Sequence, residues 1–191
     1  MEMPAATSRW TRAMLEALPE DGKRHEIIDG VHYVTPSPAP RHQFVHARLS
    51  GALFNYLERE PHGWLFSSPS DVDLGEDTIV QPDLFVVRRT GDRPPRSWSE
   101  IGAPLLAIEI ISPSTMGRDR LVKRVRYQRA GIAEYWIVDA FAQLVERWRP
   151  EDERPEIITD VLTWRPERAS SELAIELRPI FDAVADDESE A

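Results

Sequence analysis

The chain has 191 residues, of which 41% are hydrophobic and 29% are charged, and it contains no Cys. This length predicts one domain with a substantial core, and the lack of Cys excludes disulfides, thiolate zinc sites and cysteine nucleophiles. The net charge of −10 is the opposite of what phosphate binding favours. No apolar run approaches the roughly 20 residues that span a bilayer, and the first ten residues lack the pattern of a signal peptide. We therefore expect a cytoplasmic protein without a membrane segment.

The first third of the chain predicts a short helix, a hairpin and a long helix. Ser8 can cap a helix that ends before Pro19. Asp29-Gly30, between two strand-like segments, predicts a hairpin over residues 25–35. Apolar residues recur at helical spacing over residues 43–59, which indicates the longest helix of the chain.

The rest of the chain predicts mainly strands, with one further helix. A second principal helix is expected over residues 118–130, with Gly131 as its C-terminal stop. Short strands are expected over residues 64–67, 72–74, 79–80, 84–87, 105–111, 135–138, 144–148, 157–161 and 173–177. This order predicts an α+β (α/β) fold in which flanking helices cover one mixed central sheet.

The negative charge is concentrated at one end of the chain. Residues 182–191 hold five acids and no base, which predicts a disordered acidic tail after a single domain over residues 1–181. Residues 118–129, in contrast, hold six bases and one acid, a pattern that fits either a solvated helix face or a nucleic-acid contact. The chain has 21 Arg but only two Lys, Lys23 and Lys123. A lysine in so arginine-rich a chain suggests a role that Arg cannot fill, such as that of a compact point charge.

Two acids lie inside apolar segments that are expected to be strands. Asp83 precedes the apolar residues 84–87, and Glu109 interrupts the apolar run 105–111. A buried carboxylate is costly unless it is paired, hydrogen-bonded or bound to a metal. Neighbouring strands could bring both carboxylates together, and a divalent cation would relieve their repulsion; oxygen ligands favour Mg²⁺ or Mn²⁺. The alternative is that each acid pairs with a nearby Arg.

A longer series of motifs carries a resemblance to a known family. Pro82-Asp83 followed by Glu109 resembles the PD-(D/E)XK nuclease superfamily. The chain is similar over residues 10–180 to the Uma-two family of restriction-endonuclease-like proteins, because the following motifs occur in order: HEIIDG from His25, QPD ending at Asp83, IEIISPST from Ile108, Asp119, Lys123, Tyr127, and EYWIVD from Glu134. The resemblance implies a restriction-endonuclease-like fold and a metal-dependent nuclease site.

One position departs from the superfamily pattern. The usual lysine, two residues after the acid, is replaced by Ile111. We expect Lys123 to substitute for it, because Asp119, Lys123 and Tyr127 recur every four residues and would form one face of the helix. If that face turns towards the strand end, Lys123 can reach Glu109. The alternative is an ordinary ion pair between Asp119 and Lys123 on the helix surface.

The resemblance implies roles for individual residues in phosphodiester hydrolysis. Asp83, Glu109 and the backbone carbonyl of Ile110 would bind Mg²⁺ or Mn²⁺, and Lys123 would position the attacking water or stabilise developing charge. Glu26, in the HEIIDG motif, would complete the site as a third acid; the alternative is that it only caps or pairs within the hairpin. DNA is the expected partner, and its expected contacts are Arg118, Arg120, Arg124, Tyr127 and His42.

Several other expectations remain open at the level of sequence. His42 and His46 are one helical turn apart and could chelate a metal, or His42 could instead line the nuclease cleft. Tyr135 and Trp136 are expected in the core or at a subunit contact. A homodimer would suit the cutting of two strands. The competing hypothesis for function is a catalytically silent nucleic-acid-binding or assembly module that retains the nuclease fold, as Ile111 and the net acidity suggest.

Overall fold

The computed structural model describes residues 9–185 of the chain. Its helical segments are α1 (Arg12–Glu16), α2 (Pro40–Arg59), the 3₁₀ turn η1 (Trp98–Glu100), α3 (Met116–Arg118), the π-helical turn η2 (Asp119–Lys123), α4 (Arg124–Arg129) and α5 (Arg178–Asp182). Its strands are β1 (Arg24–Ile28), β2 (Val31–Thr35), β3 (Gly63–Ser67), β4 (Val72–Asp73), β5 (Ile79–Val80), β6 (Leu84–Arg88), β7 (Leu106–Ile110), β8 (Glu134–Asp139), β9 (Leu144–Trp148), β10 (Glu156–Ile158), β11 (Val161–Trp164) and β12 (Leu173–Glu176). Within residues 9–185, no helix is long and apolar enough to cross a membrane.

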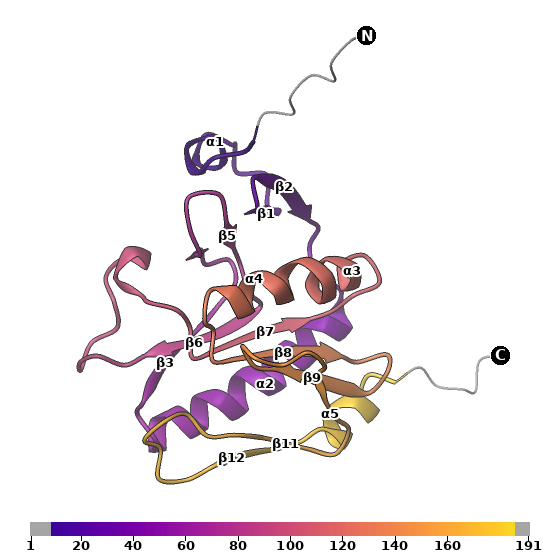
Figure 1. Cartoon of the computed structure of the whole chain (residues 1–191). Helices are drawn as coiled ribbons and strands as arrows, with labels where there is room; N and C mark the ends of the chain where they lie inside the picture. Colours follow the sequence, from indigo (N-terminus) through magenta and orange to yellow (C-terminus); the bar gives the residue numbers. More distant parts are fainter. Residues whose placement is uncertain (1–8, 186–191) are drawn as a thin grey trace, which may run out of the picture.

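A six-stranded mixed sheet forms the centre of the molecule (Figure 1). Its order is β10-β9-β8-β7-β6-β3, in which β7 and β8 are parallel and the other neighbours are antiparallel. The N-terminal hairpin pairs with β5 in a separate four-stranded sheet, and β11 pairs with β12 alone. The α+β class with a mixed central sheet is confirmed, whereas three sheets replace the single sheet that we expected.

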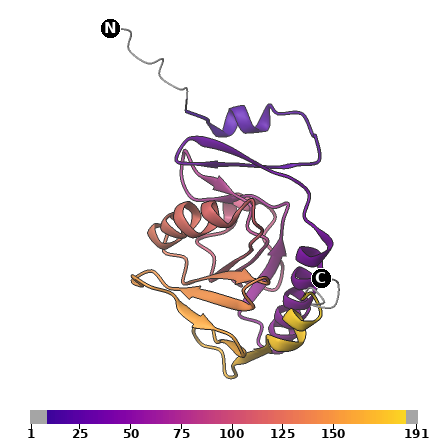
Figure 2. The ribbon, with the colours of Figure 1, turned by 90° about the vertical axis from the view of Figure 1, so that its right-hand side faces the viewer.

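The central sheet is covered by helices on both faces. Leu84 and Val86 of β6 pack in one core with residues of α2, whereas Phe85 and Val87 pack in a second core with Tyr127 of α4. This alternation follows the period of two in a strand. Every residue of β7 is buried, which explains why its sequence is a continuous apolar run broken by Glu109 alone. Figures 1 and 2 show α2 and the α3–α4 segment on opposite sides of the sheet.

The hairpin and the longest helix form where the sequence predicts them. Asp29 and Gly30 both adopt positive φ, 54° and 76°, which is the geometry of a type I′ turn. Helix α2 begins three residues before the predicted range, since Pro40 is favourable in the first helical turn. At its C-terminal end, the Glu60 carboxylate accepts hydrogen bonds from the backbone and hydroxyl groups of Ser170 and Ser171. This contact ties α2 to the segment before β12.

The second principal helix is continuous but not uniform. It begins at Met116, two residues before the predicted start, and ends at Arg129, before Gly131 with φ of 71°. Its middle is the π-helical turn η2, a feature that is frequent at functional sites. The turn carries Asp119 and Lys123 at its two ends, and both side chains are buried against the sheet.

Further boundaries also differ from the predictions. Helix α1 begins at Arg12 with Thr11 as its N-cap residue, and the predicted cap at Ser8 lies outside the described residues. The strand predicted over residues 157–161 is two strands, β10 and β11, which pair in different sheets on either side of a bend at residues 159–160. At the other end, α5 includes Asp182, the first residue of the predicted tail, and residues 186–191 lie outside the described residues.

Candidate active site

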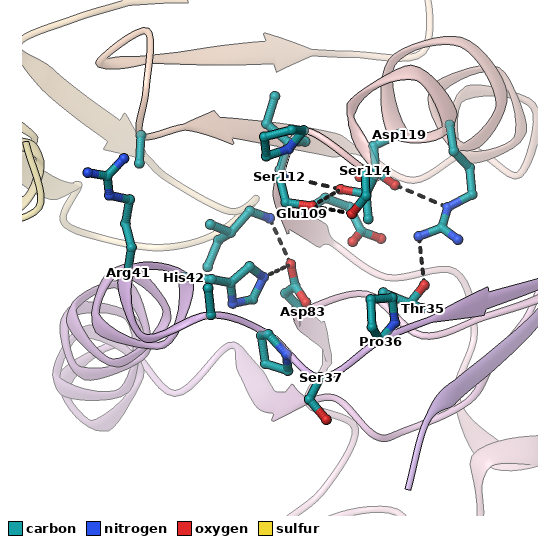
Figure 3. Close-up of a pocket in the computed structure, with 18 of the residues that line it drawn as sticks. Thr35, Pro36, Ser37, Arg41, His42, Asp83, Glu109, Ser112, Ser114 and Asp119 are labelled. Atoms are coloured by element: carbon teal, nitrogen blue, oxygen red, sulfur yellow. Dashed lines mark hydrogen bonds and ion pairs between the residues drawn. The ribbon is translucent and has the colours of Figure 1, made fainter. Parts of the chain in front are cut away.

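A cavity of about 200 Å³ opens at the end of the central sheet, where β6 begins and β7 ends (Figure 3). Its walls come from the loop before α2, the loop after β7 and the turn after β8. Because these segments are far apart in sequence, the site exists only in the folded chain. The titratable side chains that line it are Arg24, Arg41, His42, Asp83, Glu109, Arg118 and Asp119.

Asp83 and Glu109 meet in this cavity because their strands are neighbours. The antiparallel register places Leu84 opposite Ile108, so Asp83 and Glu109 follow as the next opposed pair. Both side chains are buried, with exposures of 1% and 3%. The prediction that the two acids lie on adjacent strands is confirmed.

Three donors surround the Asp83 carboxylate. Its Oδ1 accepts a hydrogen bond from Arg24 Nη1 at 2.6 Å. Its Oδ2 accepts one from the backbone N–H of Ile110 at 2.8 Å and lies 3.0 Å from His42 Nε2. Although burial opposes ionisation, His42, Arg24 and the Ile110 N–H hold the pKa of Asp83 well below its usual range. Asp83 is therefore an anion with a fixed orientation.

Glu109 lies in a different electrostatic environment. Its Oε1 accepts hydrogen bonds from Lys123 Nζ at 2.7 Å and from Tyr127 Oη at 3.0 Å. Burial, with the nearby charges of Asp119 and Asp83, raises the pKa of Glu109 to about 8 in spite of Lys123. The site therefore disfavours the ionised form of Glu109, and a further cation beside it would favour that form.

Lys123 reaches Glu109 from the helix, as the helical spacing predicts. Its Nζ lies 2.7 Å from both Glu109 Oε1 and Glu26 Oε1, and 3.8 Å from Asp119 Oδ1. Burial alone would lower the pKa of Lys123, but these acids raise it, so the ammonium stays charged. The side chain is 1% exposed and does not line the cavity. Lys123 therefore lies behind Glu109 and contacts this cavity residue from the side of the helix. Ile111, at the position of the usual lysine, is part of the second core.

Glu26 is joined to the same cluster through Lys123. Its Oε1 also accepts the backbone N–H of Gln81 at 2.8 Å, and Arg118 Nη2 lies 3.6 Å from its Oε2. Burial opposes ionisation, but Lys123 and Arg118 lower the pKa of Glu26 below its usual value. Glu26 is 1% exposed and, like Lys123, does not line the cavity.

The residues expected to contact nucleic acid fall into two groups. Arg118 and His42 line the cavity. Arg120 is instead held by Asp139 and Glu146, Arg124 lies over the ring of Trp148, and Tyr127 is fully buried. The structure corrects the expectation for Tyr127, because a side chain without exposed surface cannot contact DNA; its hydroxyl orients Glu109 instead.

Sequence reasoning missed three charged residues of the cavity, Arg24, Arg41 and Asp119. Arg24 binds Asp83 and precedes Glu26 by two positions, so the two side chains share one face of β1. That spacing indicates a shared face but not the contact with Asp83. Asp119 was expected only on a helix face, yet it lines the cavity, and among the described residues its buried Oδ1 has no hydrogen-bond partner. Burial and the other acids raise its pKa despite Lys123 and Arg118.

The donor set at the cavity fits a hard divalent cation. Four carboxylates lie in and behind the cavity and form ion pairs with Arg24, Arg118 and Lys123: Glu26, Asp83, Glu109 and Asp119. Oxygen ligands of this kind suit Mg²⁺ or Mn²⁺. Within residues 9–185, however, no group of three or more His, Cys, Asp or Glu side chains is arranged to hold a metal ion, so the fit lies in the chemistry of the donors and not in a preformed site. The two histidines do not form one either: His42 and His46 both contact Asp83, the second through its backbone carbonyl.

The mixed sheet, the two opposed acids and the lysine behind them define a nuclease-like class of protein. A family model named Uma2 and described as "Putative restriction endonuclease" matches residues 12–179, and the chain belongs to this family. The fold is also similar to a crystal structure described as "a putative nuclease belonging to DUF820" from Anabaena variabilis. That similarity has a TM-score of 0.75 and 24% sequence identity over 92% of this chain and 99% of the other. No curated protein matches the chain.

Proposed function

We propose that the protein is an endonuclease that hydrolyses phosphodiester bonds in DNA with Mg²⁺ or Mn²⁺. One observation carries the proposal: Asp83 and Glu109 line one cavity from adjacent strands, and the Lys123 ammonium lies 2.7 Å from Glu109. Membership of a nuclease family supports a nucleic-acid substrate. The carboxylates of this region supply the oxygen ligands that such an ion needs.

Each residue of the cluster has a part in the proposed reaction. Asp83, Glu109 and the backbone carbonyl of Ile110 would hold the ion, which when bound neutralises phosphate charge and lowers the pKa of water. Lys123 and Tyr127 fix the orientation of Glu109 and favour its ionised form. Lys123 is buried behind the cavity wall and does not contact the phosphate directly. Its positive charge acts across the wall and stabilises the negative charge that develops on the phosphate.

A second function, nucleic-acid binding without cleavage, is favoured by the donors around Asp83. Arg24, His42 and the Ile110 N–H already satisfy both of its oxygens. An ion that binds Asp83 must therefore share this carboxylate with Arg24, which carries the same sign of charge. If Arg24 cannot yield, the cavity binds phosphate without activating water.

Cleavage and metal binding together test the two functions. The purified protein is incubated with supercoiled plasmid and with end-labelled oligonucleotides in Mg²⁺, in Mn²⁺ and in EDTA, beside Asp83→Asn and Glu109→Gln. Glu176→Gln, which changes an exposed carboxylate on β12, is the matched control. Mn²⁺ binding is measured by calorimetry on the same proteins, and thermal melting checks that each variant is folded.

The proposal expects cleavage in Mg²⁺ or Mn²⁺ that EDTA stops. Both site variants should lose at least about 100-fold in rate, the size expected when a group that stabilises the transition state is removed. Both should also lose Mn²⁺ binding, whereas Glu176→Gln should resemble the wild type. Folded wild-type protein that binds DNA but cleaves neither DNA nor RNA would favour binding without cleavage.

A further inference from the structure

An exposed aromatic side chain stands at the wall of the cavity. Phe141, in the turn after β8, is 56% exposed and lines the cavity with Ala140. The turn is fixed, because Asp139 Oδ1 accepts the backbone N–H groups of Phe141 at 3.1 Å and Ala142 at 2.9 Å. Packing does not account for a large ring that is held in solvent beside a polar site.

A guanidinium group covers one side of this ring. The Cζ atom of Arg41 lies 4.6 Å from the ring centroid of Phe141, which is cation–π geometry. Arg41 belongs to the first turn of α2 and is adjacent to His42, the residue that contacts Asp83. Figure 3 shows His42 directed towards Asp83 and Arg41 directed away from it. The same helical turn therefore contributes to the reacting end of the cavity and to its aromatic wall.

The cavity is too small for a double helix. Its volume of about 200 Å³ lies below the roughly 300–1,000 Å³ of most small-molecule sites. Pro36 and Pro38 on one side and Pro113 on another make its walls stiff. Asp83 also lines an adjoining cavity of about 630 Å³, whereas Glu109 lines the smaller one. A strand that enters the smaller cavity without its partner strand brings a phosphodiester group to both acids. The adjoining base then lies outside the cavity, where an aromatic ring and an Arg form a platform that every base can stack on.

We propose that Phe141 and Arg41 hold an unpaired base beside the bond that is hydrolysed. The substrate class is then single-stranded DNA, or an unpaired end or flap of a duplex. This inference rests on the proposed function, and it adds two residues that determine specificity. In a duplex the same base is paired and stacked on its neighbours, so bringing it to Phe141 costs the free energy of unpairing.

The experiment measures stacking directly and in the absence of cleavage. Single-stranded and hairpin oligonucleotides that carry 2-aminopurine are titrated with protein in EDTA, because stacking on an aromatic side chain quenches this fluorophore. The variants are Phe141→Ala, Phe141→Trp, Arg41→Gln and Phe54→Ala. Phe54 is also 56% exposed but lies on α2 outside the cavity lining, which makes it the matched control. Thermal melting checks folding, and light scattering gives the oligomeric state.

The proposal expects Phe141→Ala to weaken single-strand binding by about 5- to 150-fold, the range for the loss of one stacked base. The variant should also lose the quench and the preference over duplex. Phe141→Trp should keep all three, Arg41→Gln should weaken binding, and Phe54→Ala should change nothing. Unchanged single-strand binding in Phe141→Ala would overturn the proposal, as would a change of oligomeric state, which would assign Phe141 to a subunit contact.

The same variants separate this inference from the proposed function. If Asp83→Asn abolishes cleavage while Phe141→Ala keeps wild-type affinity and strand preference, the proposed function stands and the stacking role is overturned. If the wild type cleaves nothing but Phe141→Ala loses the quench and the single-strand affinity, the stacking role is supported and the nuclease function fails.

Discussion

Removal of the Lys123 ammonium is expected to leave two buried carboxylates without their main counter-charge. Lys123→Met keeps a flexible apolar chain of similar length but cannot pair with Glu26 or Glu109, which are 1% and 3% exposed. Removing one partner of a buried ion pair costs about 3–5 kcal/mol, because the other charge stays buried. With a urea slope of about 2 kcal/mol per molar, the unfolding midpoint should fall by about 1.5–2.5 M.

Urea denaturation of three variants measures this effect. The double variant Lys123→Met with Glu109→Gln should lose less stability than Lys123→Met alone, because one of the two uncompensated charges is gone. Lys23→Met is the matched control, since Lys23 is 53% exposed and pairs with exposed Asp21; it should cost less than about 0.5 kcal/mol.

The pH dependence gives a second readout of the same variant. As the pH falls towards 5, protonation of the buried acids should shrink the penalty of Lys123→Met, because a neutral carboxyl needs no counter-charge. A loss below about 1 kcal/mol at pH 8, or a penalty that does not depend on pH, would refute the buried charge cluster.

Three further outcomes follow from contacts of single residues. Tyr127→Phe should cost about 0.5–1.5 kcal/mol in urea denaturation, the net value of one hydrogen bond, because Glu109 loses its hydroxyl donor but keeps Lys123. Arg24→Met should tighten Mn²⁺ binding by about tenfold in calorimetry, since a cation that shares Asp83 is removed; unchanged affinity would argue against an ion at Asp83. Hydrogen bonds from serines lower the pKa of Glu60 to about 2, so its contribution to stability is present above its ordinary value of 4.5 and is lost as the pH falls towards 2. Glu60→Gln should remove that acid-dependent part, as thermal melts against pH would show.

The sequence predicted the elements better than their association. The turn at Asp29-Gly30 and the helix over residues 43–59 were predictable because turn geometry and helical periodicity are local properties. The division into three sheets depends on the pairing of β1 with β5, about 50 residues away, which no local pattern specifies. The break between β10 and β11 was missed although two polar residues, Thr159 and Asp160, separate the apolar residues of the two strands.

The site residues that could be predicted are those whose type is unusual at their position in the sequence. Asp83 and Glu109 were found because a carboxylate in an apolar strand needs a partner, and Lys123 because of its rarity and its helical spacing. Arg24 and Phe141 were missed for a different reason: an Arg on a hairpin strand and a Phe in a turn conform to ordinary composition. Their importance comes from tertiary contacts with Asp83 and Arg41, which only the folded chain reveals.

The replacement of the usual lysine by Ile111 changes what the site depends on. A lysine on the strand would be positioned by β7 itself, whereas Lys123 is positioned by the docking of the α3–α4 segment on the sheet. That docking is made by Tyr127 and Ile132 in the second core, together with Ile111. The side chain of Ile111 therefore packs in the core that holds the helix in place. The docked helix places the Lys123 ammonium 2.7 Å from Glu109 Oε1. Substitutions in this core should consequently reduce the proposed nuclease activity together with the stability of the fold. The reason is that Lys123 meets Glu26 and Glu109 only when the helix is docked.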